Sequence, residues 1–375
     1  MSAAPIAPGR DSRIDADLQA LQDRVREADA TGTPLVLRGG GTKDFYGEPP
    51  SGEPLELSGW RGVIDYEPTE LVVTARCGTP LAELEATLAA SGQMLGFEPP
   101  HFGARATLGG CVAAGLSGPR RAAAGGVRDF VLGTRLLDAR GRVLAFGGQV
   151  MKNVAGYDVS RLLAGSMGIL GAIVEISLKV LPLPAAQATL RLELTHEQAL
   201  ARFNQWGGQP LPITATAWHD GEARVRLAGA QPAIDAALRR LGGERIVAPE
   251  AQAYWAGLRE QSHPFFAPAT EGAALLWRLS VPSTAPRLDL PGQALIEWGG
   301  ALRWLSAAPQ AVGAQQVRAA AARAGGTATL FRAPVAARGA VFHPLEPGVL
   351  GIHRRLKREF DPNGIFNRGR LYPGL

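Results

Sequence analysis

Three glycine-rich turns constrain this chain more than any other feature of its sequence. The first is Arg38-Gly-Gly-Gly-Thr-Lys43, which directly follows the apolar run at 34–37. The second spans Thr107–Gly115 and the third spans Lys152–Asp158, after which further glycines lead into a long alternating strand pattern. Glycine allows backbone N–H groups to converge on an anion because it has no Cβ. The three turns together predict a protein folded around a phosphate-bearing cofactor.

The first turn does not match two common nucleotide-binding motifs. A Rossmann fingerprint has the register G-x-G-x-x-G, but Asp44 stands where the last glycine would be. A Walker A loop has a Ser or Thr after its Lys, whereas Asp44 follows Lys43. Taken alone, the turn fits an ordinary tight turn after an edge strand equally well. The second and third turns favour a flavin.

The glycine turns resemble a known flavoprotein family. Segments 38–42, 107–110 and 165–171 resemble the FAD-binding domain of the vanillyl-alcohol oxidase (p-cresol methylhydroxylase, PCMH) family. Two further stretches, Val150–Arg161 and Phe360–Arg370, are similar to the E subunits of bacterial glycolate oxidase, also called glycolate dehydrogenase. The resemblance implies an α+β fold in which a two-subdomain PCMH-type FAD-binding domain precedes a smaller cap domain.

Strand and helix patterns continue beyond Leu181-Pro-Leu-Pro184, where we place the domain boundary. The first round has strands at 188–194, 213–218 and 222–228 and helices at 196–206 and 231–241. The second has strands at 273–281, 294–298, 301–306 and 327–331 and a helix at 314–324. Both rounds suit a split βαββαβ unit, which predicts an antiparallel sheet with helices on one side. The expected domains are 1–182 (FAD), 183–340 (cap) and 341–375, which returns to the FAD domain.

The resemblance also implies which residues bind the cofactor. We expect FAD to contact Arg38, Gly39, Gly40, Gly41, Thr42, Lys43, Thr107, Leu108, Gly109, Gly110, Ala113, Ala114, Ser117, Gly118, Gly168, Gly171, Ile173 and Asn367. Some family members attach FAD through a His in the first turn; Gly41 stands there, which implies noncovalent FAD. Family members usually have Pro after the residue that corresponds to Asn367, whereas this sequence has Arg368. For 107–115 a second interpretation stays open, a small-residue helix packed closely against a sheet.

Composition excludes several function classes. The net charge is +5, but the basic residues are almost all Arg and form no block, so we expect no nucleic-acid binding. The N-terminus lacks a signal-peptide core, so we expect a non-secreted, cytoplasmic protein. Cys77 and Cys111 are the only cysteines and cannot ligate a four-thiolate iron–sulfur cluster. The six histidines have no ligand spacing, so we expect no metal site.

The resemblance implies a FAD-binding subunit of a complex that oxidises glycolate to glyoxylate. Its expected partners are a catalytic flavin subunit and an iron–sulfur subunit. Through these partners we expect the chain to associate peripherally with the inner face of the cell membrane. The family's substrate motif H-x-H-x-G-D-G-N is absent, so we assign no catalytic residue. Two alternatives stay open: a self-sufficient flavin oxidoreductase using Tyr157, Arg332 or His343, and a structural subunit without cofactor.

Overall fold

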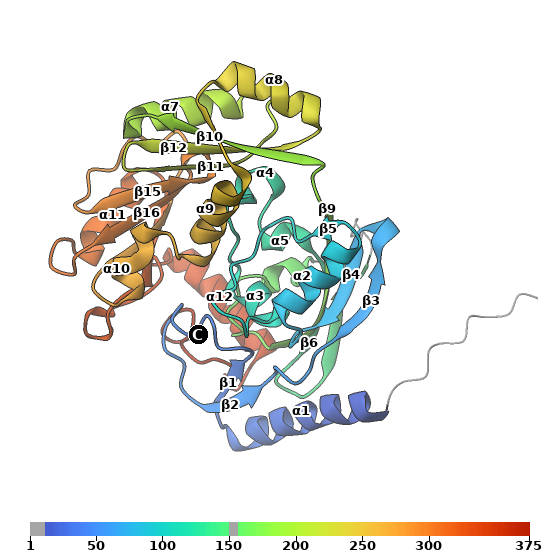
Figure 1. The fold of residues 1–375 in the computed structure, drawn as a ribbon. Coiled ribbons are helices and arrows are strands. Elements are labelled where there is room, and N and C mark those ends of the chain that lie inside the picture. Colours follow the sequence, from blue (N-terminus) through green and yellow to red (C-terminus); the bar gives the residue numbers. More distant parts are fainter. Residues whose placement is uncertain (1–11, 150–156) are drawn as a thin grey trace, which may run out of the picture.

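The computed structural model describes residues 12–149 and 157–375. Most of the predicted third turn, up to residue 156, therefore lies outside the described residues. Within the described chain, strands form an eight-stranded sheet, a five-stranded sheet and two two-stranded sheets. Figure 1 shows the eight-stranded sheet at one end of the molecule and the smaller sheets at the other.

The amino-terminal part begins with a helix and a short parallel strand pair. Helix α1 (Ser12–Thr31) leads to β1 (Leu35–Arg38), which pairs in parallel with β2 (Glu53–Glu56). On its other edge β1 is joined by the C-terminal segment, through a parallel bridge between Leu35 and Phe366. Both bridge residues are fully buried in one apolar cluster with α1. The C-terminal segment is thus a second strand-like neighbour of β1, on the edge opposite β2.

The five-stranded sheet forms the second half of the amino-terminal part and is antiparallel throughout. Its order is β3 (Val63–Glu67), β4 (Val72–Arg76), β8 (Ala172–Lys179), β6 (Val131–Leu137) and β7 (Val143–Gly147). The associated helices are α2 (Leu81–Ala90), α3 (Leu108–Ala114), α4 (Arg121–Ala124), α5 (Val127–Phe130) and α6 (Val159–Leu163). Along β8, Ile176 and Leu178 pack in the core of this sheet, whereas Ala172 and Val174 pack in the apolar cluster with α1.

The eight-stranded sheet is also antiparallel, as predicted for the cap. Its order is β13 (Glu244–Ile246), β10 (Ala186–Glu193), β12 (Glu222–Gly229), β11 (Ile213–His219), β15 (Gln293–Glu297), β16 (Leu302–Ala307), β14 (Leu275–Ser280) and β17 (Thr327–Arg332). Helices α7 (His196–Gly207), α8 (Gln231–Leu241) and α11 (Ala314–Arg323) pack on its outer face. The predicted placement of helices on one side does not hold for α9 (Ala248–Glu260), because its Trp255 and Leu258 pack on the inner face. Helix α10 (Ala267–Thr270) follows it.

The two parts meet over a shared apolar cluster. Tyr46 and Met167 from the amino-terminal part pack with Trp304 and Phe331 from the inner face of the cap sheet. Pro182 still pairs in a small sheet, β5 (Gln93–Met94) with β9 (Leu181–Pro182), whereas the cap sheet starts at β10. This change of sheet supports the predicted boundary, which stays a prediction.

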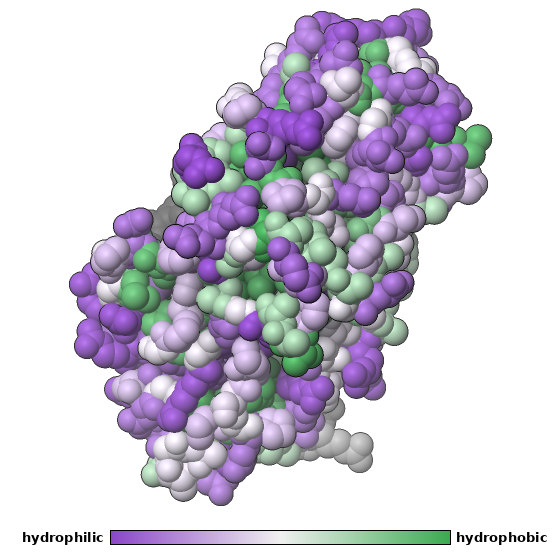
Figure 2. Space-filling model, turned by 90° about the vertical axis from the view of Figure 1, so that its left-hand side faces the viewer, coloured by the Kyte–Doolittle hydropathy of each residue, from purple (hydrophilic) through white to green (hydrophobic). Residues whose placement is uncertain are grey.

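The C-terminal segment and the surface complete the fold. Helix α12 (Pro347–Phe360) packs on the core of the five-stranded sheet before the chain reaches β1. Figure 2 shows one face of the molecule, on which hydrophilic side chains predominate and apolar ones form small separate patches. No helix among the described residues combines the length and the apolar character that a membrane span requires.

Candidate cofactor site

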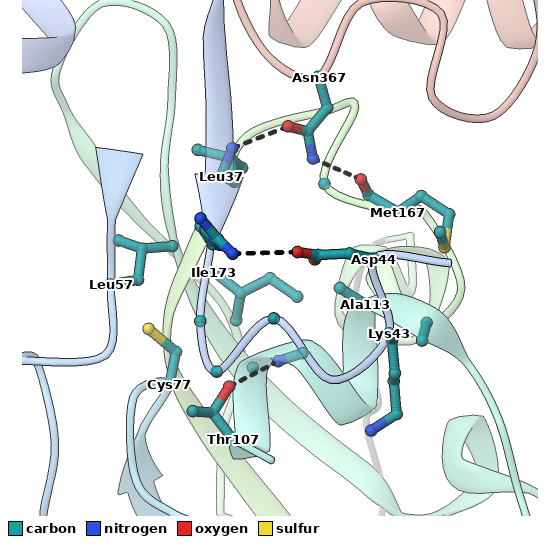
Figure 3. A pocket seen from close by; sticks show the side chains of 18 of the residues that line it. Leu37, Lys43, Asp44, Leu57, Cys77, Thr107, Ala113, Met167, Ile173 and Asn367 are labelled. Atoms are coloured by element: carbon teal, nitrogen blue, oxygen red, sulfur yellow. Dashed lines mark hydrogen bonds and ion pairs between the residues drawn. The ribbon is translucent and has the colours of Figure 1, made fainter. Parts of the chain in front are cut away.

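The first glycine turn, residues 38–43, forms a loop of unused hydrogen-bond donors. In the part of the chain that the structure describes, the backbone N–H groups of residues 39–43 donate to no protein acceptor. Gly41 has φ of 71°, a left-handed conformation that favours glycine. An ion pair between Arg38 and Asp44, 3.3 Å long, joins the two ends of the loop (Figure 3). Successive free N–H groups in a turn form a concave anion-binding surface.

Close packing, not backbone conformation, requires glycine at positions 39 and 40. A Cβ on Gly40 would lie 1.5 Å from the Arg105 carbonyl oxygen, and one on Gly39 would lie 2.4 Å from Thr107 Oγ1. The first turn therefore lies directly against the second. Substitution of Gly40 would disturb the packing of both turns as well as any cofactor.

The second turn offers fewer free donors than the first. Thr107 caps α3 by accepting from Gly110 N at 3.3 Å. The N–H of Leu108 donates to the Thr79 carbonyl (2.9 Å), and that of Gly109 donates to the Cys77 carbonyl (2.7 Å). The start of α3 is thus a small-residue helix packed against the sheet, which was the second interpretation of this turn. Gly109 and Gly110 are half-buried and line the same cavity as the first turn.

Asn367 joins the first turn to the 165–171 loop. Its Oδ1 accepts from Leu37 N at 2.8 Å, and its Nδ2 donates to the Met167 carbonyl at 2.7 Å (Figure 3). Its own N–H donates to the Leu35 carbonyl at 2.9 Å. Asn367 is buried, and its side chain is already engaged on both sides by backbone groups. We conclude that it holds two loops together.

A buried ion pair holds the backbone of the segment that carries Asn367. Lys357 Nζ lies 2.7 Å from Asp361 Oδ2 and also donates to the carbonyls of Ile169 and Phe366. Asp361 in turn accepts from the N–H groups of Ile365 and Phe366. Burial lowers the pKa of the Lys357 ammonium, and the Asp361 carboxylate opposes that shift. The pair ties α12 to the loop that lines the site.

These segments line one open cavity, whose empty space is about 810 Å³ including the part open to solvent. Among the predicted residues, its lining contains Arg38, Gly39, Gly40, Gly41, Thr42, Lys43, Thr107, Gly109, Gly110, Ala113, Ala114, Gly168, Gly171, Ile173 and Asn367. The sequence analysis missed Leu37, Asp44, Leu57, Cys77, Met167 and Arg370, which also line it.

Three predicted residues do not line this cavity. Leu108 is fully buried in the core of the five-stranded sheet, so its side chain has no access to the cavity. Ser117 and Gly118 line a separate, smaller cavity between the amino-terminal part and the cap sheet. The reason is that the chain turns away from the glycine loops after Gly115, the left-handed residue that ends α3.

Lys43 supplies a positive charge beside the first turn. Its ammonium is buried and donates to the His101 carbonyl at 3.2 Å. Burial lowers the pKa of Lys43, while the neighbouring Cys111 and Glu260 oppose the shift. Burial raises the pKa of Cys77 and of Cys111 to about 12, so both stay thiols at neutral pH. The site is therefore electropositive and free of thiolate.

The structure does not bring together the three candidate residues of a self-sufficient flavin oxidoreductase, which are Tyr157, Arg332 and His343. Tyr157 is 96% exposed. Arg332 donates to Gln261 Oε1 at 2.8 Å, and its guanidinium lies 3.5 Å from the centre of the Phe45 ring. His343 Nδ1 accepts from Ala328 N. Within the residues described, no group of three or more His, Cys, Asp and Glu side chains could hold a metal ion.

Comparison with known proteins agrees with the glycine-loop site. Residues 16–147 match a family model described as a FAD binding domain. The glycolate oxidase subunit GlcE of Escherichia coli K12 is 48% identical over 358 residues, covering 95% of this chain and 98% of that protein. The glycolate oxidase subunit GlcD of Bacillus subtilis is 31% identical over 161 residues, 42% of this chain and 34% of that protein.

A solved structure supports the fold. An alkyldihydroxyacetonephosphate synthase superposes with a TM-score of 0.65 over 95% of this chain and 75% of that chain, at 16% identity. At this identity the likeness shows the fold alone. This likeness and the family match confirm the PCMH-type α+β fold. The family match and the identity to GlcE show FAD as the cofactor.

Proposed function

Because the chain belongs to the family of the glycolate oxidase subunit GlcE, we propose that it is the FAD-binding subunit of a complex that oxidises glycolate to glyoxylate. The observation that carries this proposal is the 48% identity along 95% of the chain. The free N–H groups of residues 39–43 beside this open cavity support it independently of any relative.

The geometry supports specific roles for the loop residues. The N–H groups of residues 39–43 would hold the pyrophosphate of FAD, whose negative charge Lys43 would help to neutralise. Asn367 would act as a positioning residue, since its side chain is used by Leu37 and Met167. Gly41 leaves no nucleophile for a covalent link, so the cofactor would be noncovalent. When bound, FAD supplies two-electron acceptor chemistry.

The proposal that an iron–sulfur subunit accepts the electrons rests on the two cysteines of this chain. Cys77 and Cys111 are buried thiols and too few for an iron–sulfur cluster. Electrons would therefore leave through an iron–sulfur subunit, and a catalytic flavin subunit would oxidise the 2-hydroxy acid. We place the contacts with both on the cap domain, residues 185–335. Association with the inner face of the membrane would be peripheral and would depend on these partners.

Reconstitution tests this function. The purified chain should be yellow, and acid precipitation should release FAD into solution. Under anaerobic conditions glycolate or D-lactate should leave the flavin of the isolated chain oxidised. Adding the catalytic and iron–sulfur subunits should give glycolate-dependent dye reduction, and leaving out this chain should abolish it.

Two results would contradict the proposal. Rapid bleaching of the isolated chain's flavin by either acid would identify a self-sufficient dehydrogenase. A colourless chain that takes up no added FAD would leave only the structural role.

A further inference from the structure

Another cavity lies on the outer face of the cap sheet, the face that carries α7 and α11. Trp218 of β11, Leu279 of β14 and Leu305 of β16 line it, and each packs in one of the two apolar clusters of that face. Arg287 and Leu288, from the segment between β14 and β15, line another side. We call it the outer cavity. Water could occupy about 230 Å³ of it. One water needs only about 10–15 Å³ by this measure, so a larger molecule fits.

One buried imidazole that lines the outer cavity has a ring nitrogen without a hydrogen-bond partner. His196 is 8% exposed and is the first residue of α7. Its ring packs on the Trp218 indole, with 4.7 Å between the ring centres. Its Nε2 is buried and makes no hydrogen bond within the described chain. Burial lowers the pKa of His196 to about 4, with a contribution from Arg303 and Arg287, so the ring is neutral at neutral pH. A neutral ring with its proton on Nε2 would donate to a bound acceptor.

A buried cation without a counter-charge also lines the outer cavity. Arg303 of β16 is 4% exposed, and its guanidinium donates to the backbone carbonyls of Gly300, Ala285 and Pro286 at 2.6, 2.7 and 3.3 Å. Among the residues that the structure describes, it forms no ion pair. Burial lowers the pKa of Arg303 to about 10 and no carboxylate opposes that shift, so the group stays charged at neutral pH. A buried charge without a partner is costly, and a bound anion would offset that cost.

Positive charge outweighs negative charge around the outer cavity. Arg287 lines it, and its guanidinium lies 3.4 Å from the Glu197 carboxylate. Both side chains of this pair are mostly exposed, so the pair is weak and Arg287 can turn toward a ligand. Among the described residues that line the cavity, only Asp220 is acidic, and it lies at the exposed turn between β11 and β12. The start of α7 adds the positive end of a helix dipole.

We propose that the outer cavity binds a phosphate group, with His196 Nε2 and Arg287 donating to its oxygens and Arg303 supplying buried positive charge. A phosphate dianion balances both guanidinium charges, and its oxygens can accept from donors on three separate segments of the chain. None of the residues that line the flavin cavity lines the outer cavity. The site lies on the face of the cap sheet opposite the amino-terminal part. Phosphate binding therefore goes beyond the proposed FAD-binding function and needs no electron transfer in this chain.

Calorimetric titration of the full, FAD-loaded chain with inorganic phosphate and with methyl phosphate tests the proposal. Saturable binding is expected; tighter binding of methyl phosphate would identify a phosphate ester as the ligand, and tighter binding of inorganic phosphate the free ion. Sodium chloride at the same ionic strength should show no saturable binding. His196→Phe keeps a ring against Trp218 but lacks Nε2, and it should weaken binding about tenfold or more. The control Arg240→Gln removes a positive charge at an exposed site on α8 and should bind as the unmodified chain does.

A second variant and a second measurement separate the outer cavity from the flavin site. Arg287→Gln removes an exposed cation that holds no backbone carbonyl, so it should fold normally and also weaken binding. Flavin absorbance per protein, measured on every sample, reports FAD content, so failure of FAD binding and failure of phosphate binding remain distinct. The proposal is overturned if the unmodified chain binds neither probe, if chloride gives the same response, or if His196→Phe and Arg287→Gln both retain full affinity. In those cases water satisfies His196.

Discussion

Replacing Glu297 by Gln should make the protein more stable, and more so as pH rises. Glu297 is buried on the inner face of the cap sheet, with Trp304 Nε1 as its hydrogen-bond donor. A Gln side chain has the same shape and can accept the same hydrogen bond through its Oε1. The substitution therefore removes the ionisation and leaves the packing unchanged.

The size and sign follow from the shifted pKa. Burial raises the pKa of Glu297 from 4.5 to about 7, so between these values the folded state holds a proton that the unfolded state has lost. Raising the pH through this window therefore favours unfolding of the unmodified protein. At about 1.4 kcal/mol per pKa unit, the full effect is on the order of 3 kcal/mol. The stability gain of Glu297→Gln should grow from pH 4.5 to 7 and then stay constant.

Thermal unfolding at several pH values, followed by tryptophan fluorescence, measures this gain. Both proteins must carry the same FAD content, because a bound ligand also shifts the melting temperature. Glu271→Gln, at an exposed position, serves as the control and should show no pH-dependent difference from the unmodified chain. A difference that is constant between pH 4.5 and 8, or that shrinks as pH rises, would refute the reasoning about Glu297.

Three further substitutions test the cofactor site. Gly110→Ala adds a methyl group at the cavity wall, where the only atom within 4 Å is Thr107 Oγ1, at 3.2 Å. It should lower the amount of FAD bound per protein after gel filtration. The control Gly351→Ala adds a methyl group to open space in α12 and should leave the bound FAD unchanged. Asn367→Asp loses the N–H that binds the Met167 carbonyl and should cost about 1–3 kcal/mol, with FAD loss; unchanged melting would contradict the loop-joining role. Lys357→Met leaves the Asp361 carboxylate buried without its cation, and calorimetry should show about 3–5 kcal/mol lost.

Local sequence patterns predicted most of the fold. The helix at 231–241 and the strands around 188–194 and 327–331 were placed within two residues of their observed ends. Their apolar residues alternate with polar ones because one face is buried and the other exposed. Helix α9 was not predicted. It buries small residues such as Ala251 and Gly257 beside Trp255, so its faces differ little in hydrophobicity.

The site was predicted where glycine turns carry it and missed where its walls come from elsewhere. Gly40 was predicted to contact FAD, but glycine is required there because the Arg105 carbonyl approaches closely, which no local pattern reveals. Leu57 and Cys77 line the cavity from ordinary strand ends, so their sequence neighbours give no signal.

The bridge between Leu35 and Phe366 determines when, during synthesis, the cofactor site can be completed. β1 is synthesised early, but its neighbour at residues 365–367 leaves the ribosome about 330 residues later. Until then Leu37 N lacks Asn367 as its acceptor, and the loop at 165–171 lacks its attachment to β1. A fragment cut at residue 182 would contain all three glycine turns and still lack a finished cofactor site. The flavin would therefore be acquired only after residues 365–367 have been made and have paired with β1.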